Sequence, residues 1–226
     1  MPDIEFPTST GTAPGYLAVP DGGQGPATIV LQEWWGVDEH IRSICDRFAA
    51  EGFFALAPDL YRGETAEGPS EAEQKMMAMS MAKAEEEMCG AAAHLASQPG
   101  VQGPGVGSVG FCLGGGLSVW AGAMCPNIEA VVTYYYVMPH GKPDFTGIKG
   151  PVLGHFGTDD GFVSVEAAKE LEAEIRAAGV DVEFDFYEGA GHAFFNDTNR
   201  LGTYSESDAR RSWDRTVSFL RSALSS

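Results

Sequence analysis

Three residues of this sequence have types and surroundings that suit nucleophilic catalysis, and the first of them is Cys112. It stands in the segment Gly110-Phe111-Cys112-Leu113-Gly114, after an apolar run and before a stretch rich in small residues. This is the G-x-nucleophile-x-G turn that joins a strand to a helix, with cysteine in place of serine. The two glycines have a physical role, because side chains there would collide with the neighbouring strand and helix. We expect the helix N-terminus and an adjacent imidazole to favour the thiolate.

A candidate acid and a candidate base follow later in the chain. Asp159 and Asp160 come after the apolar run 152–156, and His192 comes after the alternating run 182–187. The order nucleophile, acid, histidine is that of α/β-hydrolases, in which a carboxylate fixes the tautomer of the base. Each residue also has a simpler interpretation: a buried cysteine, an aspartate that caps a turn, a histidine on the surface. Their order after three strands favours catalysis.

Glu33 is a fourth candidate, because it follows an apolar strand directly and precedes two tryptophans. Burial between large aromatic side chains should raise its pKa unless a cation or a hydrogen-bond donor compensates. It is either an active-site carboxylate that tunes the thiol or a turn carboxylate paired with an arginine such as Arg42 or Arg62.

The elements that must position these residues alternate between strands and helices. The expected strands are 15–19, 27–32, 53–57, 106–111, 130–136, 152–156 and 182–187. The expected helices are 41–52 behind a possible Asp38 cap, 70–98, 113–124, 164–178 and a last one that begins at a Ser205-x-x-Asp208 box. This order predicts one α/β domain over residues 1–226, with a mostly parallel central sheet and helices on both faces. Ligands bind such sheets at the carboxyl ends of the strands, which is where the candidate residues fall.

Composition limits the class of protein. The 226 residues include 32 acidic and 14 basic ones, a net charge of −18, and 44% are hydrophobic. Such a chain can bury a core, and its charge argues against nucleic-acid and anionic-membrane partners. No signal peptide or membrane-spanning run is visible. The four cysteines at 45, 89, 112 and 125 are too sparse for a disulfide framework and lack metal-ligand spacing. We expect a reduced, soluble, cytoplasmic monomer.

These residues stand in segments that strongly resemble the dienelactone hydrolase family (carboxymethylenebutenolidases) of the α/β-hydrolase fold. The similarity covers nearly the whole chain from residue 27 onward. It rests on LQEWWGVDEHIR, RFAAEGFFALAPDLYRG, VGFCLGG, DDGFV, GAGHAFF and the closing pattern of Tyr204 through Phe219-Leu220.

The resemblance implies a role for each candidate. Cys112 is expected to be the nucleophile, His192 the base, and Asp160, matched through the run 160–163, the orienting acid. Glu33 matches the glutamate that contacts the resting thiol and helps to activate it when substrate binds. The resemblance also implies an oxyanion hole formed by two backbone N–H groups, those of Trp34 and Leu113.

The expected substrate pocket departs from that of the family. Dienelactone-cleaving members hold the substrate carboxylate with an arginine four residues after the histidine, where this chain has Asn196. Arg200 could substitute from the same loop. The departure favours a neutral or more apolar ester or lactone. The residues expected to line the pocket are Trp35, Tyr136, Phe194, Asn196, Lys75 and Met79 of the methionine-rich helix, although the methionines could simply pack in the core.

The sequence therefore predicts a cysteine-dependent hydrolase of small activated esters or lactones that acts through a thioester, with no metal or organic cofactor. Since a thiolate leaves a tetrahedral intermediate readily, substrates with good leaving groups, such as enol lactones, are favoured. The alternative is a non-catalytic ligand-binding protein on the same scaffold. A redox sensor that joins Cys112 to Cys125 is implausible, because the intervening helix separates them by about 20 Å.

Overall fold

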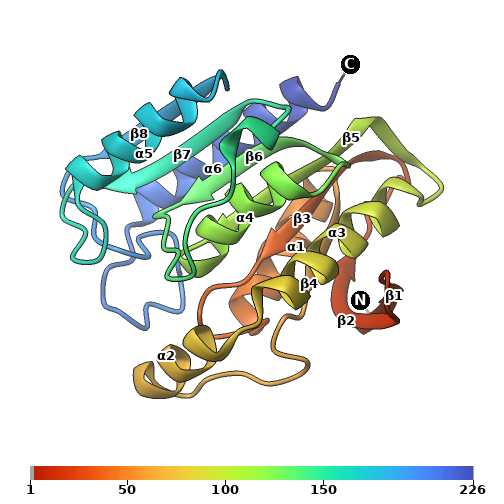
Figure 1. Ribbon diagram of the computed structural model, residues 1–226, viewed down its shortest axis with the longest axis horizontal. Coiled ribbons are helices and arrows are strands. Elements are labelled where there is room, and N and C mark those ends of the chain that lie inside the picture. The colour runs from red at the N-terminus through yellow and green to blue at the C-terminus, as the bar shows by residue number, and fades with distance from the viewer. Residues whose placement is uncertain (1–2, 226) are drawn as a thin grey trace.

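One sheet with the strand order β1-β2-β4-β3-β5-β6-β7-β8 forms the centre of the computed structural model, which describes residues 3–225 (Figure 1). β1 (Asp3–Pro7) and β2 (Thr12–Ala18) form an antiparallel edge. The remaining strands are parallel to one another: β3 (Gly25–Leu31), β4 (Phe54–Pro58), β5 (Val101–Phe111), β6 (Ile128–Tyr134), β7 (Val152–Gly157) and β8 (Val182–Tyr187). The predicted α/β fold with a mostly parallel sheet is confirmed.

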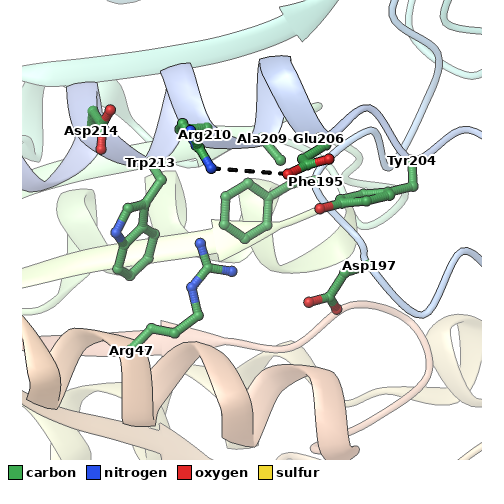
Figure 2. Close-up of a pocket in the computed structure, with 9 residues that line it drawn as sticks. All are labelled: Arg47, Phe195, Asp197, Tyr204, Glu206, Ala209, Arg210, Trp213 and Asp214. Carbon is green, nitrogen blue, oxygen red and sulfur yellow. Dashed lines mark ion pairs between the residues drawn. The ribbon is translucent and has the colours of Figure 1, made fainter.

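Helices cover both faces of this sheet, as the sequence predicts. α1 (Glu39–Ala50) and α6 (Glu206–Ala223) pack on one face, and a hollow of about 450 Å³ opens between them (Figure 2). α3 (Met81–Ala96), α4 (Leu113–Met124) and α5 (Val165–Ala177) pack on the other face. Each face therefore has its own apolar core, and the carboxyl ends of the parallel strands stay open to loops.

The helix boundaries agree with the cap residues. The Asp38 side chain accepts a hydrogen bond from the N–H of Ile41 at 3.2 Å, so the expected cap of α1 is confirmed. Ser205 caps α6 in the same way, because its hydroxyl accepts from the N–H of Asp208. Gly179 follows α5 with a φ of +88°, a conformation in which a side chain would be strained.

The long helix expected over 70–98 is wrong, because the chain forms two helices there. α2 (Pro69–Ala78) ends where Met79 turns to an extended conformation, with φ −64° and ψ 129°. Ser80, also extended, then begins α3. Serine favours the position before a helix over its interior, but the methionines on either side continue an apolar pattern that hides the break.

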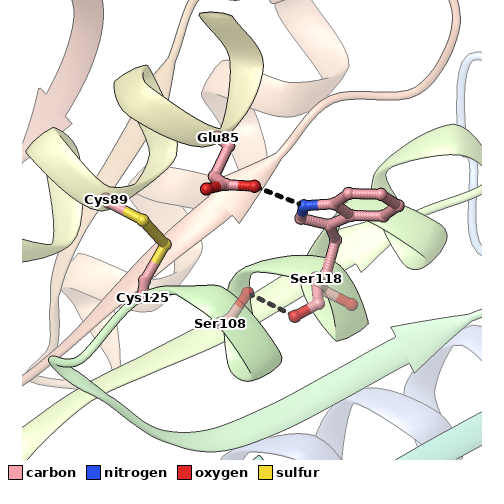
Figure 3. Close-up of a disulfide and its surroundings, with 6 residues drawn as sticks. Glu85, Cys89, Ser108, Ser118 and Cys125 are labelled. Atoms are coloured by element: carbon pink, nitrogen blue, oxygen red, sulfur yellow. Dashed lines mark hydrogen bonds between the residues drawn. A yellow bond between two sulfur atoms is a disulfide. The ribbon is translucent and has the colours of Figure 1, made fainter. Parts of the chain in front are cut away.

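The expectation that all four cysteines are reduced is also wrong. Cys89 on α3 and Cys125 at the end of α4 form a disulfide, with their Cα atoms 4.9 Å apart (Figure 3). The two helices pack on the same face of the sheet and so bring Cys89 and Cys125 together. The spacing of these cysteines in the sequence does not predict that they pair. Cys45 and Cys112 carry free, buried thiols. Among residues 3–225, no helix combines the length and the apolar character needed to cross a membrane.

Candidate active site

The turn at Cys112 has the strained geometry that its two glycines predict. Cys112 lies between β5 and α4 with a φ of +56° and a ψ of −115°. A Cβ atom on Gly110 would lie 1.8 Å from the carbonyl oxygen of Gly114, and one on Gly114 would lie 2.1 Å from that of Leu31. Strand, turn and following helix are therefore in backbone contact, and only glycine fits at both positions.

The environment of the Cys112 thiol keeps it protonated at rest. The residue is 6% exposed, and this burial is the main reason that its pKa lies well above the ordinary value. The charge of Glu33 raises the pKa further. Backbone N–H groups of Leu113 and Trp34 act on the sulfur and lower the pKa, but by less than burial raises it. The N–H of Leu113 at the start of α4 thus favours the thiolate, as expected of a helix N-terminus, but burial outweighs this effect.

His192 is held by Asp160 and not by its neighbour Asp159. The Nδ1 atom of His192 lies 2.8 Å from one carboxylate oxygen of Asp160. The other oxygen accepts the backbone N–H groups of Phe162 and Val163 at 2.7 and 2.9 Å, so the carboxylate is fixed on both sides. The Nε2 atom of His192 is buried and has no hydrogen-bond partner within residues 3–225. That ring therefore has one anchored nitrogen and one nitrogen free to exchange a proton.

Cys112 and His192 line the same small cavity, of about 40 Å³. Its other walls are apolar side chains, namely Trp34, Met76, Val137 and Phe162. The Phe162 ring lies 4.6 Å from the ring of His192 and is 61% exposed, so it separates the cavity from solvent. Val137 and Phe162 were not among the predicted pocket residues, although Phe162 stands in the run 160–163 through which Asp160 was matched.

Glu33 is buried beside this pair, at 2% exposure. One carboxylate oxygen accepts a hydrogen bond from the hydroxyl of Tyr135 at 3.2 Å, and the other accepts one from the side-chain amide of Asn196 at 2.7 Å. Burial raises the pKa of Glu33, as predicted. The alternative pairing with Arg42 or Arg62 is wrong, because these arginines pair with other carboxylates.

Three of the residues expected in the substrate pocket lie elsewhere around the site. Asn196 faces Glu33 instead of the cavity, and its own oxygen accepts from Thr198. Trp35 packs in a small core with Ala66 and with Ala72 of α2, whereas its neighbour Trp34 lines the cavity. Phe194 is fully buried in the core.

The other three expected pocket residues line two other hollows. Tyr136 lines one of about 350 Å³ beside α5, which shares Val137 and Phe162 with the Cys112 cavity. Lys75 and Met79 line one of about 320 Å³ near α3, and the Lys75 ammonium pairs with Glu64 and Glu71. In the part of the chain that the structure describes, none of the six lines the Cys112 cavity.

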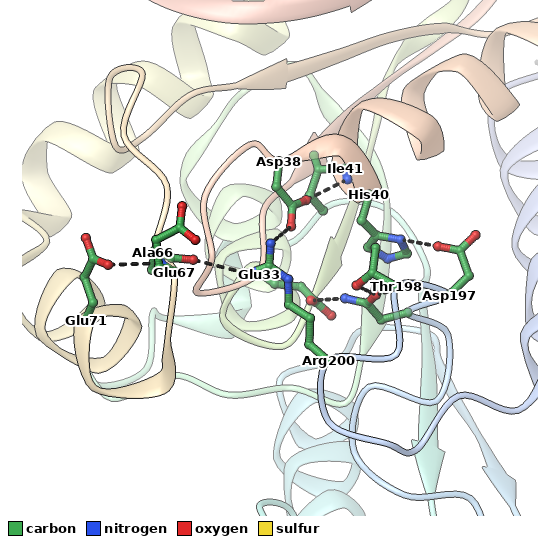
Figure 4. Close-up of polar contacts among 11 residues, drawn as sticks. Glu33, Asp38, His40, Ile41, Ala66, Glu67, Glu71, Asp197, Thr198 and Arg200 are labelled. Carbon is green, nitrogen blue, oxygen red and sulfur yellow. Dashed lines mark hydrogen bonds and ion pairs between the residues drawn. The ribbon is translucent and has the colours of Figure 1, made fainter.

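Arg200 does not reach the cavity either. Its guanidinium lies 3.5 Å from the carboxylate of Asp38, donates to the carbonyl of Ala66 at 3.2 Å and stacks over Trp35 (Figure 4). These contacts hold the loop after β3, and Arg200 is not among the residues that line the Cys112 cavity.

The hollow between α1 and α6 has none of the chemistry of the Cys112 cavity. Arg47 lies there over the rings of Trp213 and Phe195, and the remaining walls are Tyr204, Ala209, Arg210 and the three carboxylates of Asp197, Glu206 and Asp214 (Figure 2). It contains neither a nucleophile nor a histidine. No cluster of His, Cys, Asp and Glu within residues 3–225 is arranged to hold a metal ion.

Comparison with known proteins agrees with the resemblance found in the sequence. Residues 13–224 match the dienelactone hydrolase family. The chain belongs to this family. "Protein usf" of Aquifex pyrophilus is 35% identical over 98% of each chain, and the "Putative carboxymethylenebutenolidase" of Aquifex aeolicus (strain VF5) is 31% identical over 98% of each. The solved structure "m3DLH" superposes with a TM-score of 0.88 at 26% identity, over 99% of this chain and 98% of that one.

Proposed function

We propose that this dienelactone hydrolase family member cleaves small, neutral esters or lactones with Cys112 as its nucleophile. The observation that carries the proposal is the pair formed by His192 and Asp160, because His192 lines the same cavity as Cys112 and its Nε2 atom has no hydrogen-bond partner within residues 3–225. A base oriented by a carboxylate next to a nucleophile on a strained turn is the arrangement that acyl transfer requires.

The reaction then proceeds in two halves. The Nε2 atom of His192 takes the thiol proton as sulfur bonds to the carbonyl carbon, and the N–H groups of Trp34 and Leu113 stabilise the oxyanion. Each such donor contributes about 3 kcal/mol to the transition state. When the intermediate collapses, the alcohol leaves with the proton from His192, and a thioester remains. His192 next takes a proton from water, which attacks the thioester, and the proton returns to sulfur as the acid departs.

The walls of the cavity support a neutral substrate. Its lining has apolar side chains and, within residues 3–225, no arginine or lysine. Asn196 and Arg200, which could have recognised a carboxylate, are bonded to Glu33 and Asp38 instead. An anionic group placed against these walls would lose its hydration without a partner, which is costly. The volume of about 40 Å³ also favours a small acyl group.

Replacement of Cys112 tests the proposal against a matched control. Cys112→Ala should reduce hydrolysis of p-nitrophenyl acetate and of a neutral enol lactone to the uncatalysed rate. Cys45→Ala, which removes the other buried free thiol, should retain most of the activity. Mass spectrometry of the wild type mixed with substrate and quenched in acid should detect an acyl group on Cys112. Full activity in Cys112→Ala would mean that another residue attacks. Tight binding by the wild type without turnover would favour the ligand-binding alternative.

A further inference from the structure

A second histidine–carboxylate pair lies close to Glu33 and has no part in the mechanism above. His40 is 2% exposed on α1, and its Nδ1 atom lies 2.9 Å from a carboxylate oxygen of Asp197 (Figure 4). Its Nε2 atom is buried without a hydrogen-bond partner in the described chain.

The chain links this pair to Glu33 through two adjacent residues. Asp197 follows Asn196, so two successive residues of the loop after β8 hold the His40 ring and the Glu33 carboxylate. The rings of Phe111 and Phe195 meet the His40 ring nearly edge-on, with centroids 6.4 and 6.2 Å away. The imidazole is therefore fixed in place by aromatic contacts as well as by its carboxylate.

The charges around Glu33 single out His40. The titratable groups that interact with Glu33 are His40, Asp38, His192, Cys112 and Tyr135. Asp38 raises the pKa of Glu33, whereas His40, the Asn196 amide and His192 lower it, with His40 the largest of the three. The amide supplies a hydrogen bond without charge, and Arg200 is already paired with Asp38. A buried carboxylate needs a cation nearby, and His40 is placed to provide it.

We propose that His40, held by Asp197, is a positioning residue that supplies the positive charge accompanying an ionised Glu33. The inference rests on the proposed function in one respect, because it is through the Cys112 thiol that Glu33 affects catalysis. Glu33 opposes ionisation of that thiol when it is charged. The balance between His40 and Glu33 therefore determines which group near the sulfur carries a proton before substrate enters.

Titration of Glu33 in variants tests this without any need for turnover. The infrared band of the protonated Glu33 carboxyl group, assigned by its loss in Glu33→Gln, reports the ionisation directly. His40→Gln should move the midpoint upward by about one pH unit or more, the effect of losing a nearby opposite charge. His155→Gln is the matched control, because His155 is another fully buried histidine and bonds to Tyr187 and Thr216 instead. The midpoint of Glu33 in His155→Gln should equal that in the wild type.

Asp197→Asn provides a second route if His40→Gln does not fold. It leaves the imidazole in the core but removes the carboxylate that anchors its Nδ1 atom, so a smaller upward shift of the Glu33 midpoint is expected. An unchanged midpoint in a folded His40→Gln protein, or in Asp197→Asn where only that variant folds, overturns the proposal. In profiles of kcat/KM against pH, adding His40→Gln to the wild type should move the midpoint. Adding it to the Glu33→Gln variant should leave the midpoint unchanged. Because the infrared readout does not depend on the nucleophile, activity in Cys112→Ala would refute the proposed function and leave this inference standing.

Discussion

Reduction of the disulfide between Cys89 and Cys125 should lower the free energy of unfolding by about 4 kcal/mol. The bond joins residues 36 apart in the sequence. Closing a loop of that length removes entropy from the unfolded chain worth about 3.8 kcal/mol at 25 °C, and strain in the native state would reduce the benefit. In a chain of 226 residues, the loss corresponds to a melting temperature lower by roughly 8–16 °C.

Urea unfolding with and without a thiol reductant measures this loss. The Cys89→Ser/Cys125→Ser variant is the control, because its unfolding should not respond to the reductant. Activity at low temperature should survive reduction, since the intervening α4 places Cys125 about 20 Å from Cys112. Equal unfolding free energies with and without reductant, in a sample whose thiols are shown to be freed, would refute the loop-closure reasoning.

Three further changes have definite expected results. Gly114→Ala should abolish activity and lower the yield of folded protein, because its Cβ atom would lie 2.1 Å from the carbonyl oxygen of Leu31. Gly22→Ala is the control, since no atom lies within 4 Å of its Cβ position, and it should match the wild type in the same assay and in circular dichroism. Phe162→Ala should raise kcat/KM for esters with bulkier acyl groups relative to acetate, because an exposed ring that closes the cavity is removed. Burial lowers the pKa of His155 to about 3, below its unfolded value of about 6.5, so stability present above pH 6.5 is lost as the pH falls. Between pH 6.5 and 5, the free energy of unfolding measured in urea should fall by about 2 kcal/mol because of His155. This part of the pH dependence should be absent from His155→Gln.

The parts of the fold that depend on local chemistry could be predicted from the sequence. α4 begins and ends where expected, because the glycine turn fixes its start and the small residues fit against the sheet. The candidate acid and base follow from chain order, since parallel strands bring their carboxyl ends to one edge. β1 was not identified, because only Phe6 of its five residues is buried and an edge strand leaves little apolar pattern.

The walls of the cavity could not be predicted, because they depend on which way a side chain turns after a strand ends. β6 ends at Tyr134, and Tyr135 then takes a φ of +37°, which breaks the alternation of the strand. Tyr135 consequently faces Glu33, while Tyr136 faces a different hollow. The adjacent tryptophans also point to different places, because Trp34 lines the Cys112 cavity and Trp35 packs in the core beside α2. A run of identical residues cannot indicate which member turns inward.

The resting state of Cys112 shows how opposing electrostatic effects are ranked by magnitude. A helix N-terminus stabilises a charge by about 0.3–1 kcal/mol, up to about 2 kcal/mol in partly buried sites. Removing an ion from water costs several kcal/mol, even after the protein relaxes. Burial therefore dominates at this thiol and raises its pKa, although α4 begins directly behind it. Because the helix cannot ionise the sulfur unaided, attack requires proton transfer to His192 in the same step, so the rate should depend on the imidazole and on the charge of Glu33 more than on the turn that presents the thiol.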